Sequence, residues 1–132
     1  MTEESRWILR FKNFEKSYMF FKKIVDREDF SNIEIAALIK SFEFTYEIAW
    51  KTVKDYLEEQ GLPIKFPREA IKEGFRTEII RDGQTWMQML EKINELAHTY
   101  SEEIADDSVD LIKNKFYPAI TQVYQYFKDR CE

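Results

Sequence analysis

The sequence predicts an all-α fold, an antiparallel up-and-down four-helix bundle with one short extra helix, and two observations carry this prediction. Apolar residues recur at three- and four-residue spacing over long segments. The chain also has only three glycines and three prolines with which to build turns. With 132 residues, 44% of them hydrophobic, residues 1–132 are enough for one domain whose core needs neither disulfides nor metal. We therefore expect a single, mostly helical domain.

The first two helices have the clearest patterns. The first is expected from about Arg6 to Val25, where apolar residues form one stripe. The second follows the capping-box sequence of residues 31–34, with Phe30 and Ile35 placed as a hydrophobic staple. It carries a broad apolar face and ends before Gly61. At about 28 residues it would be about 42 Å long, a length typical of helices in bundles.

The third and fourth helices are shorter. Pro67 suits the first turn of a helix that reaches about Thr77. The Asp82-Gly83 pair predicts a turn before a fourth helix from about Gln84 to Ala97. Its apolar stripe consists of Trp86, Met89, Leu90, Ile93 and either Leu96 or Ala97.

The last helix has Thr99 or Ser101 as its expected cap. Apolar residues continue from Ile104 to Phe127. Pro118 lies inside this pattern, where its missing N–H and its ring should kink the helix or divide it in two.

Charge and cysteine content exclude some functions. The net charge is −5, so general binding of nucleic acid through phosphate neutralisation is not expected as the main activity. The first helix is basic, and a solvated helix face is the simplest interpretation. A single cysteine, Cys131, cannot form an internal disulfide or a thiolate metal site, which favours a reducing compartment. With no secretory leader and no uncharged stretch long enough to span a membrane, we expect a cytoplasmic protein.

Two patterns in the helices invite further interpretations. Glu43, Glu47, Lys51 and Asp55 follow one another at four-residue spacing in the second helix. An exposed ladder with a Glu47–Lys51 pair explains them best, since no second histidine completes a metal shell. We expect neither a metal nor a cofactor. The eleven Phe, seven Tyr and three Trp residues exceed the needs of one small core, which favours self-association.

The only histidine of the chain, His98, lies in the segment from Lys92 to Tyr100. An imidazole can exchange a proton near neutral pH, and the phenol of Tyr100 offers a hydrogen bond or a nucleophilic oxygen. Asn94 and His98 would lie about 40° apart on one helix face. On the residues alone, a lone histidine near a helix end is usually structural or a surface side chain.

Residues 42–61, Phe42-Glu43-Phe44-Thr45-Tyr46-Glu47-Ile48-Ala49-Trp50-Lys51-Thr52-Val53-Lys54-Asp55-Tyr56-Leu57-Glu58-Glu59-Gln60-Gly61, resemble the nucleotidyltransferase substrate-binding proteins, a branch of the HEPN superfamily. Weaker similarities lie at residues 10–16, 67–75 and 86–100, so the resemblance covers nearly the whole chain. It implies a four-helix bundle that forms a homodimer and pairs with a minimal nucleotidyltransferase. The homodimer and the nucleotidyltransferase could together form a heterotetramer. Active relatives, the toxin branch, are metal-independent ribonucleases whose motif is arginine, four residues, histidine, any residue and tyrosine, shared by two protomers.

The resemblance assigns roles to individual residues. His98 matches the motif histidine, Tyr100 matches the tyrosine to which the partner transfers AMP, and Asn94 matches a common asparagine. The motif arginine is replaced by Ile93, which cannot stabilise charge on a phosphate. Lys92 is about 100° around the helix from Ile93 and is at most an auxiliary cation.

Three functions remain open at this point. The preferred one is a subunit that pairs with a minimal nucleotidyltransferase and has a nucleotide- or AMP-accepting cleft around His98 and Tyr100, without enzymatic activity of its own. The alternative is a metal-independent ribonuclease toxin with a degenerate motif, in which His98 is the general base, aided by Asn94 and Lys92, and RNA is the ligand. The third is a helical dimer that retains no chemistry.

Overall fold

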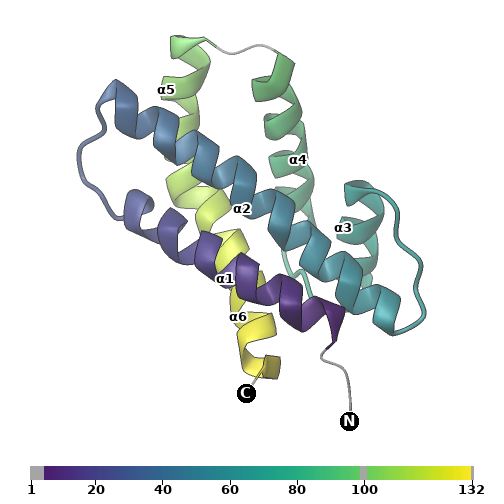
Figure 1. Cartoon of the computed structure of the whole chain (residues 1–132). Coiled ribbons are helices and arrows are strands. Elements are labelled where there is room, and N and C mark those ends of the chain that lie inside the picture. The colour runs from purple at the N-terminus through teal and green to yellow at the C-terminus, as the bar shows by residue number, and fades with distance from the viewer. Residues whose placement is uncertain (1–4, 99–100, 132) are drawn as a thin grey trace.

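A computed structural model describes residues 5–98 and 101–131, and it is helical throughout its elements (Figure 1). The elements are α1 (Arg6–Val25), α2 (Asn32–Glu59), α3 (Pro67–Arg76), α4 (Gly83–His98), α5 (Glu102–Leu111), a π-helical segment η1 (Ile112–Phe116) and α6 (Tyr117–Cys131). Helices α5, η1 and α6 follow one another as one long rod behind α1 and α2. The predicted four-helix bundle with the extra helix α3 is confirmed.

Helices α1 and α2 form the best-connected pair of the bundle. The predicted cap of α2 is present: the Ser31 hydroxyl accepts the Glu34 N–H at 3.3 Å, and the Glu34 carboxylate accepts the Ser31 N–H at 3.3 Å. The helix has 28 residues, the predicted length. Further along, the side-chain hydroxyls of Ser17 and Thr45 hydrogen-bond to each other between the helices at 2.5 Å.

Aromatic side chains fill the core between α1, α2, η1 and α6. The rings of Tyr18 and Tyr124 stack with centroids 4.2 Å apart, and those of Phe42 and Phe116 stack at 5.2 Å. Trp86 is fully buried and brings α4 against Tyr46 of α2. Such pairs add directional contacts to the burial of apolar surface, so they fix how the helices lie against one another.

The connection between α3 and α4 contains a left-handed residue that ends α3 and a side-chain cap that begins α4. Glu78 adopts a left-handed conformation with φ 66°, where glycine is usual, and the N–H of Ile79 bonds to the Gly74 carbonyl at 2.9 Å. Asp82 then starts α4, because its carboxylate accepts the N–H of Thr85 at 3.1 Å and the Thr85 hydroxyl at 2.6 Å. These contacts end one helix and begin the next within a few residues.

Pro118 divides the last rod as predicted, through the π-helical segment that precedes it. Proline lacks an N–H, and in a regular helix its ring would meet the carbonyl four residues earlier, that of Asn114. Residues 112–116 widen into π-helical geometry before it, which is a known way for a helix to accommodate such a disruption. Ser101 caps α5 by accepting the Ile104 N–H at 3.2 Å, whereas Thr99 lies outside the described residues.

One prediction about α2 is wrong in part. The Glu47–Lys51 pair of the proposed ladder exists, with 3.1 Å between the Lys51 ammonium and the Glu47 carboxylate. Asp55, however, is only 2% exposed and accepts a hydrogen bond from the Arg10 guanidinium at 2.9 Å. Asp55 faces the interior of the bundle, because Arg10 of α1 supplies a cation there. The carboxylate therefore links α1 to α2 instead of facing solvent.

Candidate functional site

The predicted motif lies at the C-terminal end of α4, where the helix continues through His98. Asn94 and His98 are one helical turn apart, and both are exposed. Tyr100 lies outside the described residues. Among the described residues, no hydrogen bond orients the His98 imidazole or the Asn94 amide. The structure thus places both residues on an exposed edge of α4.

Ile93 occupies the position where the motif has arginine, and its environment is apolar. The side chain is half-buried and packs against the hydrophobic core, as the stripe through Trp86 and Met89 predicted. Lys92 forms an ion pair with Glu95: its ammonium donates to the Glu95 carboxylate at 2.7 Å, and only 20% of its side chain is exposed. This edge therefore carries a histidine and an amide, and Lys92, the cation nearest to them in the sequence, is paired with Glu95.

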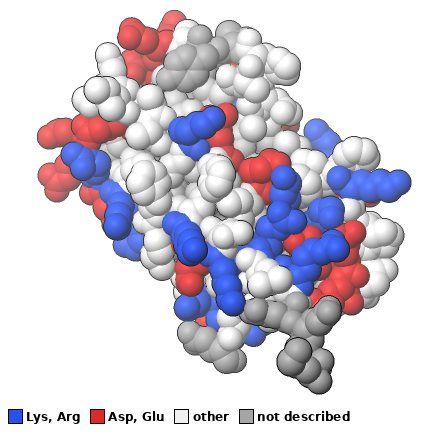
Figure 2. All heavy atoms as spheres, in the orientation of Figure 1, with Lys and Arg blue, Asp and Glu red and all other residues white. Residues whose placement is uncertain are grey.

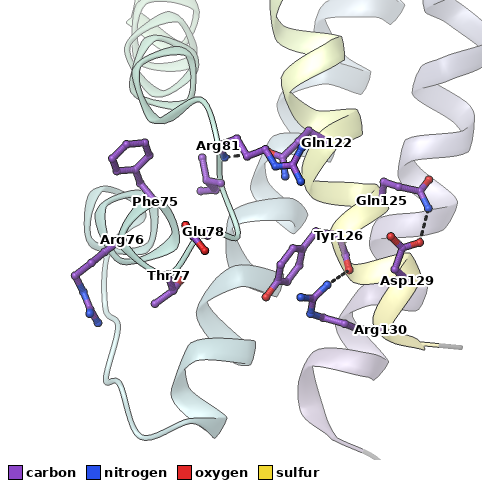
Figure 3. Close-up of a pocket in the computed structure, with 11 residues that line it drawn as sticks. Phe75, Arg76, Thr77, Glu78, Arg81, Gln122, Gln125, Tyr126, Asp129 and Arg130 are labelled. Carbon is purple, nitrogen blue, oxygen red and sulfur yellow. Dashed lines mark hydrogen bonds between the residues drawn. The ribbon is translucent and has the colours of Figure 1, made fainter.

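A hollow of about 990 Å³ lies between the α3–α4 connection and α6 (Figure 3). Gln122 joins its two sides, because its amide donates to the Ile79 carbonyl at 3.0 Å and accepts the Arg81 N–H at 3.1 Å. Tyr126 points into this space, and the Arg130 guanidinium lies 3.4 Å from the centre of its ring. Burial raises the pKa of the Tyr126 phenol above its ordinary value.

A second hollow, of about 780 Å³, follows the outer face of α1 and α2. We call it the α1–α2 groove, and it is lined by Arg10, Asn13, Lys16, Ser17, Phe20, Ala37, Lys40, Ser41, Phe44 and Ile48. Figure 2 shows this side of the molecule, with lysine and arginine side chains on both sides of uncharged surface. The basic first helix was visible in the sequence. That it lines a groove was not, because α2 supplies the other wall.

Neither hollow includes Asn94 or His98, so the predicted motif and the two hollows are separate places on the surface. Within the part of the chain that the structure describes, no group of three or more His, Cys, Asp or Glu side chains is arranged to hold a metal ion. None of the described helices is long and apolar enough to cross a membrane.

Comparison with known proteins identifies the family. The family model for proteins described as nucleotidyltransferase substrate binding protein like matches residues 9–129. A crystal structure of a protein from Thermus thermophilus superimposes with a TM-score of 0.73 at 27% identity, and the match covers 89% of this chain and 97% of that one. A search of curated proteins finds no match. Because the family model spans nearly the whole bundle, from α1 to α6, the chain belongs to the nucleotidyltransferase substrate-binding protein family.

Proposed function

We propose that this chain is a helical subunit that pairs with a minimal nucleotidyltransferase and presents the segment around His98 and Tyr100 as its nucleotide- or AMP-accepting site. The observation that carries the proposal is the family match over residues 9–129, because the description of that family names a nucleotidyltransferase. The exposed end of α4 adds support, since a partner enzyme has open access to that edge. We further propose that two copies associate there, as the family resemblance implies.

The side chains at this edge favour receiving a nucleotide over cutting RNA. Cleavage through the 2′-hydroxyl needs a base for its proton and a cation for the charge that grows on the phosphate. His98 is able to act as the base, but Ile93 packs against the core and Lys92 is paired with Glu95. Loss of one such charge-stabilising donor typically lowers a rate by about 100- to 1000-fold. An acceptor role needs no cation from this chain, because the nucleotidyltransferase supplies the chemistry.

In the proposed transfer, the Tyr100 phenolic oxygen attacks the α-phosphorus of ATP. A bond forms between that oxygen and phosphorus, the bond to the leaving pyrophosphate breaks, and the phenolic proton goes to a base. His98 is two residues away in sequence and is an exposed imidazole, so it is the candidate for that base. The tyrosine gains one adenylyl group, and one pyrophosphate is released.

Co-expression with a minimal nucleotidyltransferase from the same organism tests both parts. We expect the two chains to co-purify, and intact-mass measurement after incubation with ATP to show one added adenylyl group. Tyr100→Phe should abolish the mass increase, whereas the matched control Tyr126→Phe should keep it. Failure to co-purify, or labelling that persists in Tyr100→Phe, would contradict the proposal.

An RNA cleavage assay without added metal separates the ribonuclease alternative. We expect no cleavage by the purified chain, and Ile93→Arg serves as the variant that restores the motif. Cleavage by the wild-type chain that disappears in His98→Ala would establish a ribonuclease and overturn the acceptor role.

A further inference from the structure

The α1–α2 groove has the composition of a docking surface. Two phenyl rings face solvent across it, one from each helix: Phe20 is 60% exposed and Phe44 is 59% exposed. Between them the groove contains the small side chains of Ser17, Ala37 and Ser41. Exposing two large rings to water costs hydrophobic free energy that a bound partner would recover. An apolar centre bordered by polar groups is typical of protein interfaces.

The border of the groove is positive. Arg10, Lys16 and Lys40 line it, and no carboxylate does among the described residues, although acidic residues outnumber basic ones in the chain by 25 to 20. Arg10 is committed to Asp55, but Lys16 and Lys40 have no ion-pair partner within the described ranges 5–98 and 101–131. An occupant that carries negative charge would therefore complement the groove.

A second copy of this chain does not match the groove in charge and apolar surface. A two-fold contact through the groove would bring its positive border to face an identical positive border, and like charges across an interface are unfavourable. The most acidic helix, α5, exposes only charge on its outer face: Glu102, Glu103, Asp106, Asp107 and Asp110 are exposed, and its apolar side chains face the core. Among the described residues, the large exposed apolar side chains lie outside α5.

From this geometry we infer that the α1–α2 groove binds an acidic amphipathic helix of the nucleotidyltransferase partner. Its apolar face would contact Phe20 and Phe44, and its carboxylates would face Lys16 and Lys40. The wall from Ala37 to Ile48 is about 16 Å long, which fits about three turns of helix. The inference rests on the proposed function, because it names where the partner binds. It concerns a surface apart from His98 and Tyr100.

Binding measurements on the purified chains test the groove directly. The probe is the same minimal nucleotidyltransferase, immobilised, and the readout is its Kd for each variant. Phe20→Ala and Phe44→Ala should each weaken binding by about 30-fold, the usual effect of removing an aromatic hot spot. Lys16→Glu with Lys40→Glu should weaken it by at least about 10-fold, and added salt should weaken the wild-type complex more than this variant.

The matched controls are an exposed phenylalanine and two exposed lysines that lie outside the groove, near α3. Phe66→Ala removes a phenyl ring that is 63% exposed near α3, and Lys65→Glu with Lys72→Glu reverses two exposed lysines there. These controls should bind as tightly as the wild-type chain. Circular dichroism on every variant checks that the bundle is folded, and we expect all of them to fold because the substituted positions are exposed.

The outcomes separate this inference from the proposed function. A wild-type complex with all groove variants binding normally overturns the groove inference and leaves the proposed function standing. Absence of any wild-type complex overturns both. Light scattering of the chain alone gives a third outcome: a dimer that Phe20→Ala or Phe44→Ala turns into a monomer would assign the groove to a second copy. Tight binding of a labelled single-stranded oligouridine, lost in the same variants, would assign it to RNA. Either result contradicts the inference.

Discussion

The α1–α2 pair and the C-terminal end of α4 are built in opposite ways. Between α1 and α2, Arg10 bonds to Asp55, Ser17 bonds to Thr45, and aromatic rings fill the space behind them. At the end of α4, Asn94 and His98 are exposed, and no contact among the described residues orients them. The comparison separates two tasks in one small domain. One region holds the bundle together through its inner side chains, and the other leaves its polar side chains facing solvent.

The largest expected effect comes from the core side of α2. Phe42 is fully buried and stacks on Phe116, so Phe42→Ala should lower the free energy of unfolding by about 3–5 kcal/mol through lost burial and a cavity. Phe44→Ala, two residues along the same helix, removes a ring that is 59% exposed and should change it by less than about 0.5 kcal/mol. Urea unfolding measures both. Equal losses would mean that the outer ring is part of the fold.

The Arg10–Asp55 pair should give the next largest effect. Arg10→Met leaves the Asp55 carboxylate buried with only the Lys54 ammonium near it among the described residues, at 3.9 Å. We expect a loss of about 1–3 kcal/mol, toward the lower end because the Arg10 side chain is about a third exposed and solvent reaches it. A double-mutant cycle with Asp55→Asn isolates the pair, since the neutral amide no longer needs a cation. Strictly additive effects would show that the pair adds nothing to the helix contact.

Asp82 offers a smaller effect with a defined pH dependence. Hydrogen bonds from the Thr85 hydroxyl and N–H lower the pKa of the Asp82 carboxyl below its ordinary value. Because the folded state favours the charged form, the stabilisation is present above the ordinary pKa of about 3.9 and is lost as the pH falls through the lowered value. Asp82→Ala should cost about 1 kcal/mol at neutral pH.

Measuring the free energy of unfolding of the wild-type chain and of Asp82→Ala as a function of pH tests whether the charge on Asp82 is responsible. The difference between wild type and variant should shrink as the pH falls below about 4, because the wild-type carboxyl becomes protonated. Asp82→Asn keeps a neutral cap and should show a weaker pH dependence than the wild-type chain. A difference that stays constant down to strongly acidic pH would mean that the charge on Asp82 does not stabilise α4.

Local sequence predicted the helices well, because their determinants are local. The bounds of α1, α2 and α3 follow from apolar spacing, from the Ser31–Glu34 capping box and from Pro67 at a first turn. Asp55 was placed wrongly because its partner, Arg10, is 45 residues away in the sequence. Four-residue spacing reports neighbours on the same helix and says nothing about a cation supplied by another helix.

The same distinction explains the candidate sites. The position of Asn94 and His98 on one exposed edge follows from helical geometry, and the burial of Ile93 follows from the apolar stripe of α4. The groove and the hollow beside Tyr126 join segments far apart in the chain, Phe20 with Phe44 in one case and Arg81 with Gln122 in the other. No local pattern contains such a pairing, so only the packed bundle reveals them.

The smallest effect on stability is expected where the effect on function is largest. His98→Ala removes an exposed side chain with no described contact, so the free energy of unfolding should change by less than about 0.5 kcal/mol. If His98 takes the Tyr100 proton, the same variant should slow adenylylation by about 100-fold or more, the usual contribution of a general base. A loss above about 1 kcal/mol in urea unfolding, with unchanged labelling, would make His98 a structural residue and move the end of α4 into the same category as the α1–α2 pair.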